Sequence, residues 1–174
     1  MKYISVLLIT FVSISLQAQD PSNTKFEKVQ TLDSTIETLY NVISGEKGEP
    51  RDWELFSYLF KPDAKLIPMG RGAEDEIGVV YWSPKNYIEQ AGKWLVENGF
   101  FEKEIHRETH TFGNITQIFS TYESYKSATD TEPFMRGINS IQLLNDGKRW
   151  WVINIYWMSE NEANPIPERY LPKQ

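Results

Sequence analysis

The chain contains no cysteine, and this absence excludes several kinds of scaffold and site. Without thiols there is no disulfide framework, no thiolate metal centre and no cysteine nucleophile. A lipid anchor of the bacterial lipoprotein type is excluded too, because it needs a cysteine at the cleavage position. The fold must therefore be held together by a hydrophobic core, and 174 residues are enough for one such core.

Basic residues are also few, with 18 Lys and Arg against 24 Asp and Glu. Binding to a phosphate backbone depends on clustered Lys and Arg, so nucleic acid is not an expected partner. Nucleotide and nucleophile motifs are absent as well. Gly70-Arg71-Gly72 lacks the further glycine and the lysine of a phosphate-binding loop, and no Gly-x-Ser-x-Gly elbow occurs. We expect no cofactor.

One long apolar run is present, and it lies at the N-terminus. Residues 4–16 follow Lys2, are interrupted only by small hydroxyl residues, and lead to Ala18 at a small-residue cleavage site. The run is too short to span about 30 Å of hydrocarbon comfortably. The pattern predicts a signal peptide over residues 1–18, cleaved after Ala18, and an exported periplasmic or extracellular protein without a membrane anchor.

The first half of the mature chain is mainly helical by its periodicity. After a polar leader at residues 19–31, apolar side chains spaced by three and four residues predict a helix over 26–43, which overlaps the end of that leader. A second helix is predicted over 52–60 with Asp52 as N-cap, and a third begins at Ser83-Pro84. Two short strands, over 65–69 and 77–82, lie between these helices.

From Phe100 onward the apolar residues alternate instead. This alternation predicts long strands over 100–112, 115–127, 134–144 and 149–158. Their short connections, including the Asp146-Gly147 turn, imply an antiparallel meander. We predict an α+β fold: a cone-shaped, curved antiparallel sheet of four long and two short strands, packed against three helices from the N-terminal half. The domain is expected over 32–160, with an extended tail over 161–174.

Three segments carry a resemblance to a known family: Phe119-Ser-Thr-Tyr-Glu123, residues 133–143, and Gly147-Lys-Arg-Trp-Trp151 with Trp157. Together with the order of elements over 32–158, they resemble the nuclear transport factor 2-like superfamily, and more closely its SnoaL-like, secreted bacterial branch. The resemblance implies the cone fold. It leaves the activity open, since the superfamily includes dehydratases, isomerases, cyclases and noncatalytic domains.

The two histidines are the most reactive side chains in the predicted sheet. His106 and His110 share a strand face with Glu102, Glu104 and Glu108 under strict alternation. Positions four apart in a strand are about 13 Å apart, too far to hold one metal ion, so no metal site is expected. In the enzymes resembled, an acid/base His or Asp projects into the cone, and His106 could transfer protons there. A His106 hydrogen-bonded at the sheet surface is the simpler alternative.

Polar residues on the next two strands are further candidates. Tyr122 and Glu123 are neighbours and face opposite sides, so at most one of them lines a given cavity. Arg136 could anchor a ligand carboxylate, but pairing with Glu123 across the sheet is the favoured interpretation. Asn139 lies among apolar residues and, if interior, needs a protein or ligand partner.

The last strand predicts what covers the sheet. Trp151, Ile153, Ile155 and Trp157 alternate in phase and indicate a buried face, while the opposite face is also largely apolar. A sheet that is apolar on both sides needs two covers. One is the helical layer, and the second is predicted to be another subunit, because sheet-to-sheet homodimers are common in the family resembled.

Three functional hypotheses follow. The first is a noncatalytic domain that binds a small, partly apolar ligand in the cone. Its predicted pocket is formed by Tyr40, Trp53, Phe56, His106, Tyr122, Asn139 and Trp157. The second is a cofactor-free lyase or isomerase with His106 as acid/base and Tyr122 or Asn139 orienting the substrate oxygen. The third is a dimeric interaction domain that uses the apolar sheet face.

Overall fold

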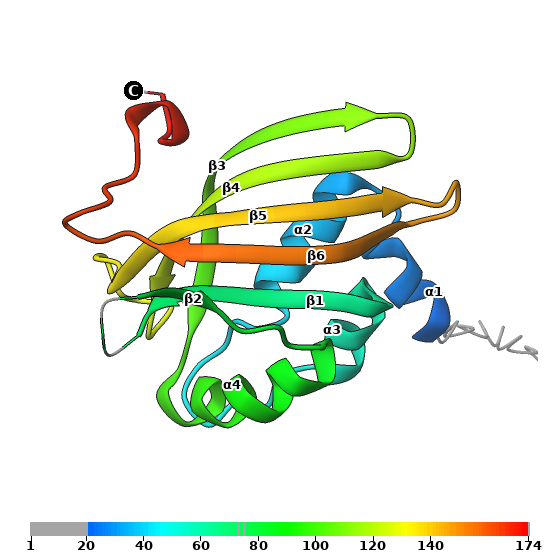
Figure 1. Ribbon diagram of the computed structural model, residues 1–174. Helices are drawn as coiled ribbons and strands as arrows, with labels where there is room; N and C mark the ends of the chain where they lie inside the picture. Colours follow the sequence, from blue (N-terminus) through cyan, green and yellow to red (C-terminus); the bar gives the residue numbers. More distant parts are fainter. Residues whose placement is uncertain (1–20, 73, 75, 174) are drawn as a thin grey trace, which may run out of the picture.

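The computed structural model describes residues 21–72, 74 and 76–173, and these form one curved sheet with helices packed against one face (Figure 1). The strands follow the order β2-β1-β6-β5-β4-β3. This arrangement confirms the predicted α+β class and curved sheet. The predicted signal peptide lies outside the described residues.

The helices are α1 (Pro21–Glu27), α2 (Leu32–Asn41), α3 (Trp53–Leu59) and α4 (Pro84–Asn98). The single helix predicted over 26–43 is wrong, because Thr31 interrupts it. The Thr31 side chain accepts a hydrogen bond from the Ser34 amide at 3.0 Å, and the Thr31 amide donates one to the Ser34 hydroxyl at 3.2 Å. This reciprocal cap starts a new helix. The predicted N-caps Asp52 and Ser83 are confirmed.

The strands are β1 (Phe60–Arg71), β2 (Ile77–Val79), β3 (Phe101–Phe112), β4 (Ile115–Tyr125), β5 (Met135–Asn145) and β6 (Trp150–Ser159). The antiparallel meander from β3 to β6 is confirmed, and Gly147 takes a positive φ of 88° in its last turn. The sheet as a whole is mixed, however, because β1 is longer than predicted and pairs in parallel with β6. Periodicity describes a strand's faces and says nothing about a distant partner.

Two β-bulges change which residues face the helices. On β3, Glu104 pairs with Tyr122 and His106 with Thr121, so Ile105 has no partner in the register. On β6, Val152 pairs with Leu143 and Asn154 with Gln142, which leaves Ile153 unpaired. An extra residue of this kind reverses the alternation beyond it.

The β6 bulge corrects the predicted buried face. Val152 and Ile155 are both buried in the core, and Trp157 packs against it, although Val152 is out of phase with the other two. Trp151 lies on the other face, beside Tyr58, with ring centroids 6.4 Å apart. The set of four residues predicted to share one face is therefore split by Ile153.

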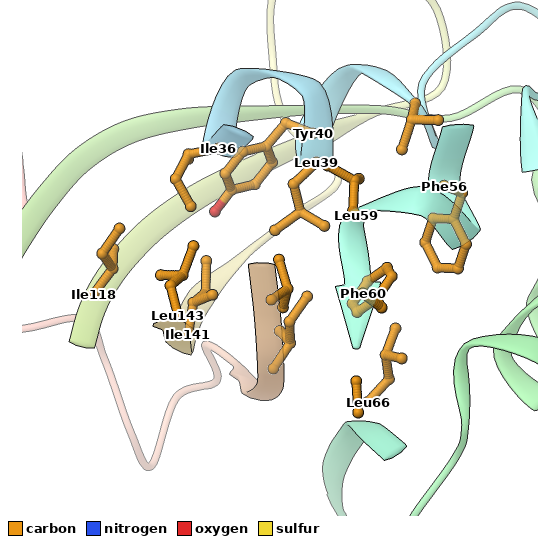
Figure 2. Close-up of a cluster of buried hydrophobic side chains, with 14 of the residues drawn as sticks. Ile36, Leu39, Tyr40, Phe56, Leu59, Phe60, Leu66, Ile118, Ile141 and Leu143 are labelled. Carbon is orange, nitrogen blue, oxygen red and sulfur yellow. The ribbon is translucent and has the colours of Figure 1, made fainter. Parts of the chain in front are cut away.

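The core lies between α2, α3 and the inner face of the sheet. Figure 2 shows Ile36, Leu39 and Tyr40 of α2 directed toward Ile118 and side chains of the neighbouring strands. Phe56 and Leu59 of α3 and the first residues of β1 continue this cluster, which also contains Ile141, Leu143 and Val152. The Tyr40 ring thus places a hydroxyl deep inside a mostly apolar layer.

The C-terminal segment returns over the outer face of the sheet, away from the helices (Figure 1). The Thr121 hydroxyl donates to the Tyr170 carbonyl at 2.6 Å, and the Phe119 and Tyr170 rings lie 5.0 Å apart. Next to it, Arg136 lies opposite Glu123 in the register of β4 and β5, as predicted, but donates to Glu160 at 2.8 Å, so the predicted ion pair with Glu123 is wrong. Glu123 instead accepts a hydrogen bond from the Tyr125 hydroxyl.

Candidate functional site

A cavity of about 250 Å³ lies between α2, α4 and the inner face of the sheet. Its walls are mostly aromatic, with eight rings: Tyr40, Phe56, Trp82, Tyr87, Trp94, Phe100, Tyr122 and Trp157. Aliphatic side chains of α2, α4, β1 and β6 complete them. Besides the tyrosine hydroxyls and tryptophan ring nitrogens, the polar side-chain atoms come from Glu102 and Asn139. The cavity suits a small and largely apolar molecule.

Glu102 and Asn139 meet at the wall of this cavity. Asn139, from β5, donates to the Glu102 carboxylate at 3.3 Å and to the Tyr40 hydroxyl at 3.0 Å. Ser124 of β4 donates to the other Glu102 oxygen at 3.5 Å. Both hydrogen-bond partners of the Glu102 carboxylate are thus donors, and donors favour its ionised form.

Burial acts on Glu102 in the opposite direction and is the larger effect. Removal from water raises the pKa of this carboxyl from 4.5 to about 7, and the donors Asn139 and Ser124 offset only part of the rise. A carboxyl with such a pKa exchanges protons near neutral pH. The tyrosine pKa values are raised as well: burial and, secondarily, Glu102 raise that of Tyr87, and burial raises that of Tyr122 to about 12.

A hydrogen-bonded chain leads from Asn139 through the core to the surface. The Tyr40 hydroxyl bonds the Ser120 hydroxyl at 2.7 Å, and Ser120 donates to Glu104 at 2.5 Å. Glu104 in turn accepts from Arg107 at 2.9 Å, and Arg107 reaches Asp33 of α2 at 2.7 Å. Tyr40 is therefore fixed at both sides, which explains how a buried tyrosine is tolerated there.

A second, smaller hollow lies behind the same wall. Glu37 and Asn41 of α2 line it together with Lys103, Glu104 and Arg107 of β3. Tyr40 and Glu102 border both this hollow and the aromatic cavity. Tyr40 and Glu102 thus form a partition between the two spaces.

Five of the seven residues predicted to form the pocket line the cavity: Tyr40, Phe56, Tyr122, Asn139 and Trp157. Trp53 does not, since it lies behind the wall against Phe56, with ring centroids 5.7 Å apart. His106 does not line it either. The bulge at Ile105 turns His106 to the outer face, opposite Thr121, where its Nε2 is buried without a hydrogen-bond partner among the described residues.

Glu102 is the residue that strict alternation missed. Strict alternation puts it on one face with His106, and the alternating Glu102, Glu104 and Glu108 have a simpler interpretation as the solvated face of a strand. One signal in the sequence pointed to the interior: Glu102 follows the apolar Phe100 by two positions, and such residues share a face in a strand. Both line the cavity.

The described part of the chain shows neither a metal-binding cluster nor a membrane-spanning helix. Its His, Asp and Glu side chains form no group of three or more that could hold a metal ion. None of its helices is long and apolar enough to cross a membrane.

The comparisons with known proteins concern the fold. No protein-family model and no curated protein matches this sequence. Among solved structures, an NTF2-like protein of unknown function from Pseudomonas putida has a TM-score of 0.56 and 11% identity over 84% of this chain and 94% of that chain.

Two further structures are similar to the same extent. An NTF2-like superfamily protein from Salmonella enterica serovar Typhimurium has a TM-score of 0.54 and 13% identity, over 84% of this chain and 95% of that one. A protein of unknown function with a cystatin-like fold from Nostoc punctiforme has a TM-score of 0.56 and 10% identity, over 75% and 90%. The chain therefore has the nuclear transport factor 2-like fold that its order of elements predicts.

Proposed function

We propose that this domain binds a small, largely apolar molecule in the aromatic cavity, with a polar group of the ligand against Glu102 and Asn139. The observation that carries the proposal is the cavity itself: its walls are mostly aromatic and aliphatic, and one polar pair lies at a fixed point in them. Apolar surface supplies affinity in such sites, and a few placed polar groups supply orientation. The resemblance to the SnoaL-like branch agrees with this proposal.

The test is to identify what the protein carries. Mature protein should be purified without heating, and its small molecules released and analysed by mass spectrometry. An Ala91→Trp variant, which fills the cavity from α4, should lose the ligand. Ala128→Trp, at an exposed loop position, is the matched control and should keep it. Equal recovery of the same molecule from both variants would place its binding site elsewhere.

A second candidate function is proton transfer by an enzyme that uses Glu102 where His106 was predicted. The specific observation is the Glu102 pKa of about 7, which suits a general acid/base. Tyr122 and Asn139 would orient a substrate oxygen, as predicted from the sequence. The test is exchange of carbon-bound hydrogen in the captured ligand for deuterium, followed by NMR in D₂O. Wild-type protein should accelerate the exchange and Glu102→Gln should not.

Export and dimerisation complete the proposal. The signal peptide predicted over residues 1–18 supports export. N-terminal sequencing of protein from the periplasm or medium should give a sequence that begins after Ala18.

A homodimer through the outer sheet face is supported by partly exposed apolar side chains on β5 and β6, among them Ile138, Tyr156 and Met158. The C-terminal segment covers the neighbouring part of that face, near Phe119 and Thr121.

A further inference from the structure

The cavity contains an acidic group without a matching base. The residues that line it include one carboxylic acid, Glu102, and no Lys, Arg or His. In the described structure, the hydrogen-bond partners of the Glu102 carboxylate are the neutral side chains Asn139 and Ser124. A buried carboxylate beside apolar walls and without a counter-charge is unfavourable, so the site is electrostatically incomplete.

The neighbouring acid shows what a completed pair looks like in this fold. Glu104, two residues along β3 on the same face, is also partly buried, yet Arg107 binds it through both Nε and Nη2. The protein thus supplies a cation for Glu104 and leaves Glu102 with neutral donors. The difference between the two carboxylates is the absence of a protein cation at the one that faces the cavity.

The walls around Glu102 favour a positive charge as well. Aromatic rings present a negative face, and cations, including quaternary ammonium groups, are attracted to such faces when water is excluded. Trp82, Tyr87 and Trp157 line the same cavity as Glu102, and the rings of Trp82 and Tyr87 lie 6.3 Å apart. An anionic ligand would meet a carboxylate and no base, so it is disfavoured on the same grounds.

We propose that the cavity binds an organic ammonium ion, an amine or quaternary ammonium group on a compact apolar body, with its charge beside Glu102 and against the aromatic walls. This inference rests on the proposed small-molecule binding and specifies its ligand class. The competing ligand is a neutral molecule hydrogen-bonded to protonated Glu102. Asn139 and Ser124 already donate to both carboxylate oxygens, and this arrangement suits the ionised form better than the protonated one.

The experiment compares two probes of one shape and different charge: benzyltrimethylammonium and its uncharged carbon isostere, neopentylbenzene. Binding is followed by the fluorescence of the tryptophans in the wall, in titrations of the full mature protein. We expect the cation to bind at least about tenfold more tightly than the isostere at about pH 8, when Glu102 is ionised. The preference should shrink on acidification to about pH 5.5, because protonation removes the carboxylate charge.

Variants assign the effect to Glu102. Glu102→Gln should lower the affinity for the cation by about tenfold and leave that for the isostere unchanged. Glu108→Gln is the matched control, since Glu108 lies on the same strand but faces outward, opposite Phe119. It should behave as wild type. If Glu102→Gln does not fold, as judged by circular dichroism, the pH series on wild-type protein carries the test alone.

The outcomes separate this inference from the function on which it rests. Equal or tighter binding of neopentylbenzene at about pH 8 would overturn the ammonium inference and leave a ligand-binding cavity in place. A cation preference that is unchanged in Glu102→Gln would also overturn it. Absence of binding by benzyltrimethylammonium at millimolar concentration and by neopentylbenzene up to its solubility limit would count against the ammonium inference and the proposed function together.

Discussion

At the residue scale, Glu102 and Glu104 show how position on one strand face sets the chemistry of a carboxyl group. Both point inward from β3, on the same side of the bulge at Ile105. Glu104 is neutralised by Arg107, which in turn reaches Asp33 at the surface. Glu102 has no such partner, and burial raises its pKa to about 7. Glu104 is thus part of a structural ion pair, whereas Glu102, two residues away on the same strand, titrates near neutrality.

The raised pKa of Glu102 makes stability depend on pH in a defined direction. Because the folded-state value lies above the unfolded one, the folded protein binds the proton more tightly. The associated stabilisation is complete below about pH 4.5 and is lost as pH rises through about 7. We expect the free energy of unfolding of wild type, relative to Glu102→Gln, to fall by up to about 3 kcal/mol over this window.

Urea unfolding at several pH values in and beyond this window measures that difference. Comparison with Glu102→Gln removes the pH dependence of all other groups, provided that they behave alike in both proteins. Glu108→Gln should follow the wild-type curve. Parallel curves for wild type and Glu102→Gln would show that Glu102 titrates normally.

Gly137 is a second residue whose identity the site depends on. A Cβ at this position would collide with the Tyr122 hydroxyl and lie 2.5 Å from the Met158 carbonyl oxygen. Gly137→Ala should therefore displace Tyr122 from the cavity wall and lower the free energy of unfolding by about 1–3 kcal/mol. Gly78→Ala, where an added Cβ meets nothing within 4 Å, is the control. Indistinguishable denaturation midpoints would refute the close approach.

At the element scale, the two bulges decide which side chains face the cavity. The helices α3 and α4 with their caps at Asp52 and Ser83, and the four-strand meander, follow from spacing and turn residues and could be predicted from the sequence. The helix boundary at Thr31 was not predicted. The outward position of His106 could not be predicted, and the one signal for the inward position of Glu102 was its spacing of two residues from Phe100. Ile105 and Ile153 have no sequence feature that distinguishes a bulge residue from a paired one, and each reverses the alternation that follows it.

The C-terminal segment is an element whose contribution can be measured. Tyr170 packs its ring on Phe119, and its carbonyl accepts a hydrogen bond from Thr121. Tyr170→Ala removes the ring contact and keeps the backbone bond, so we expect a loss of about 1–2 kcal/mol in stability. Thermal unfolding measures it, with the exposed Lys173→Ala as the comparison. An unchanged melting temperature would mean that the segment lies on the sheet without stabilising it.

At the scale of the whole molecule, the sheet separates two surfaces with different roles. The inner face and the helices enclose the cavity, while the outer face is shared between the C-terminal segment and the patch on β5 and β6. A stable interface buries about 800 Å² on each partner, and a sheet face of this kind is suited to that. The proposed homodimer uses this patch and leaves the cavity free.

Sedimentation velocity tests that arrangement. The mature chain should sediment as a dimer, and Ile138→Glu, which places a charge on the outer face of β5, should convert it to a monomer. Phe112→Glu introduces the same charge at the tip of the β3–β4 hairpin, where Phe112 is 83% exposed, and should leave the dimer intact. A monomeric wild-type protein at micromolar concentration would contradict the dimer.

The partition formed by Tyr40 and Glu102 has a consequence for the timing of binding. Glu102 borders the hollow beneath α2 as well as the cavity, so we expect protons to reach its carboxyl through that hollow while a ligand occupies the cavity. Proton exchange and ligand exchange would then follow different routes. Glu102 could then be protonated while the ligand is still bound. The loss of its negative charge would weaken the binding of the proposed ammonium ion, so acidification would release it.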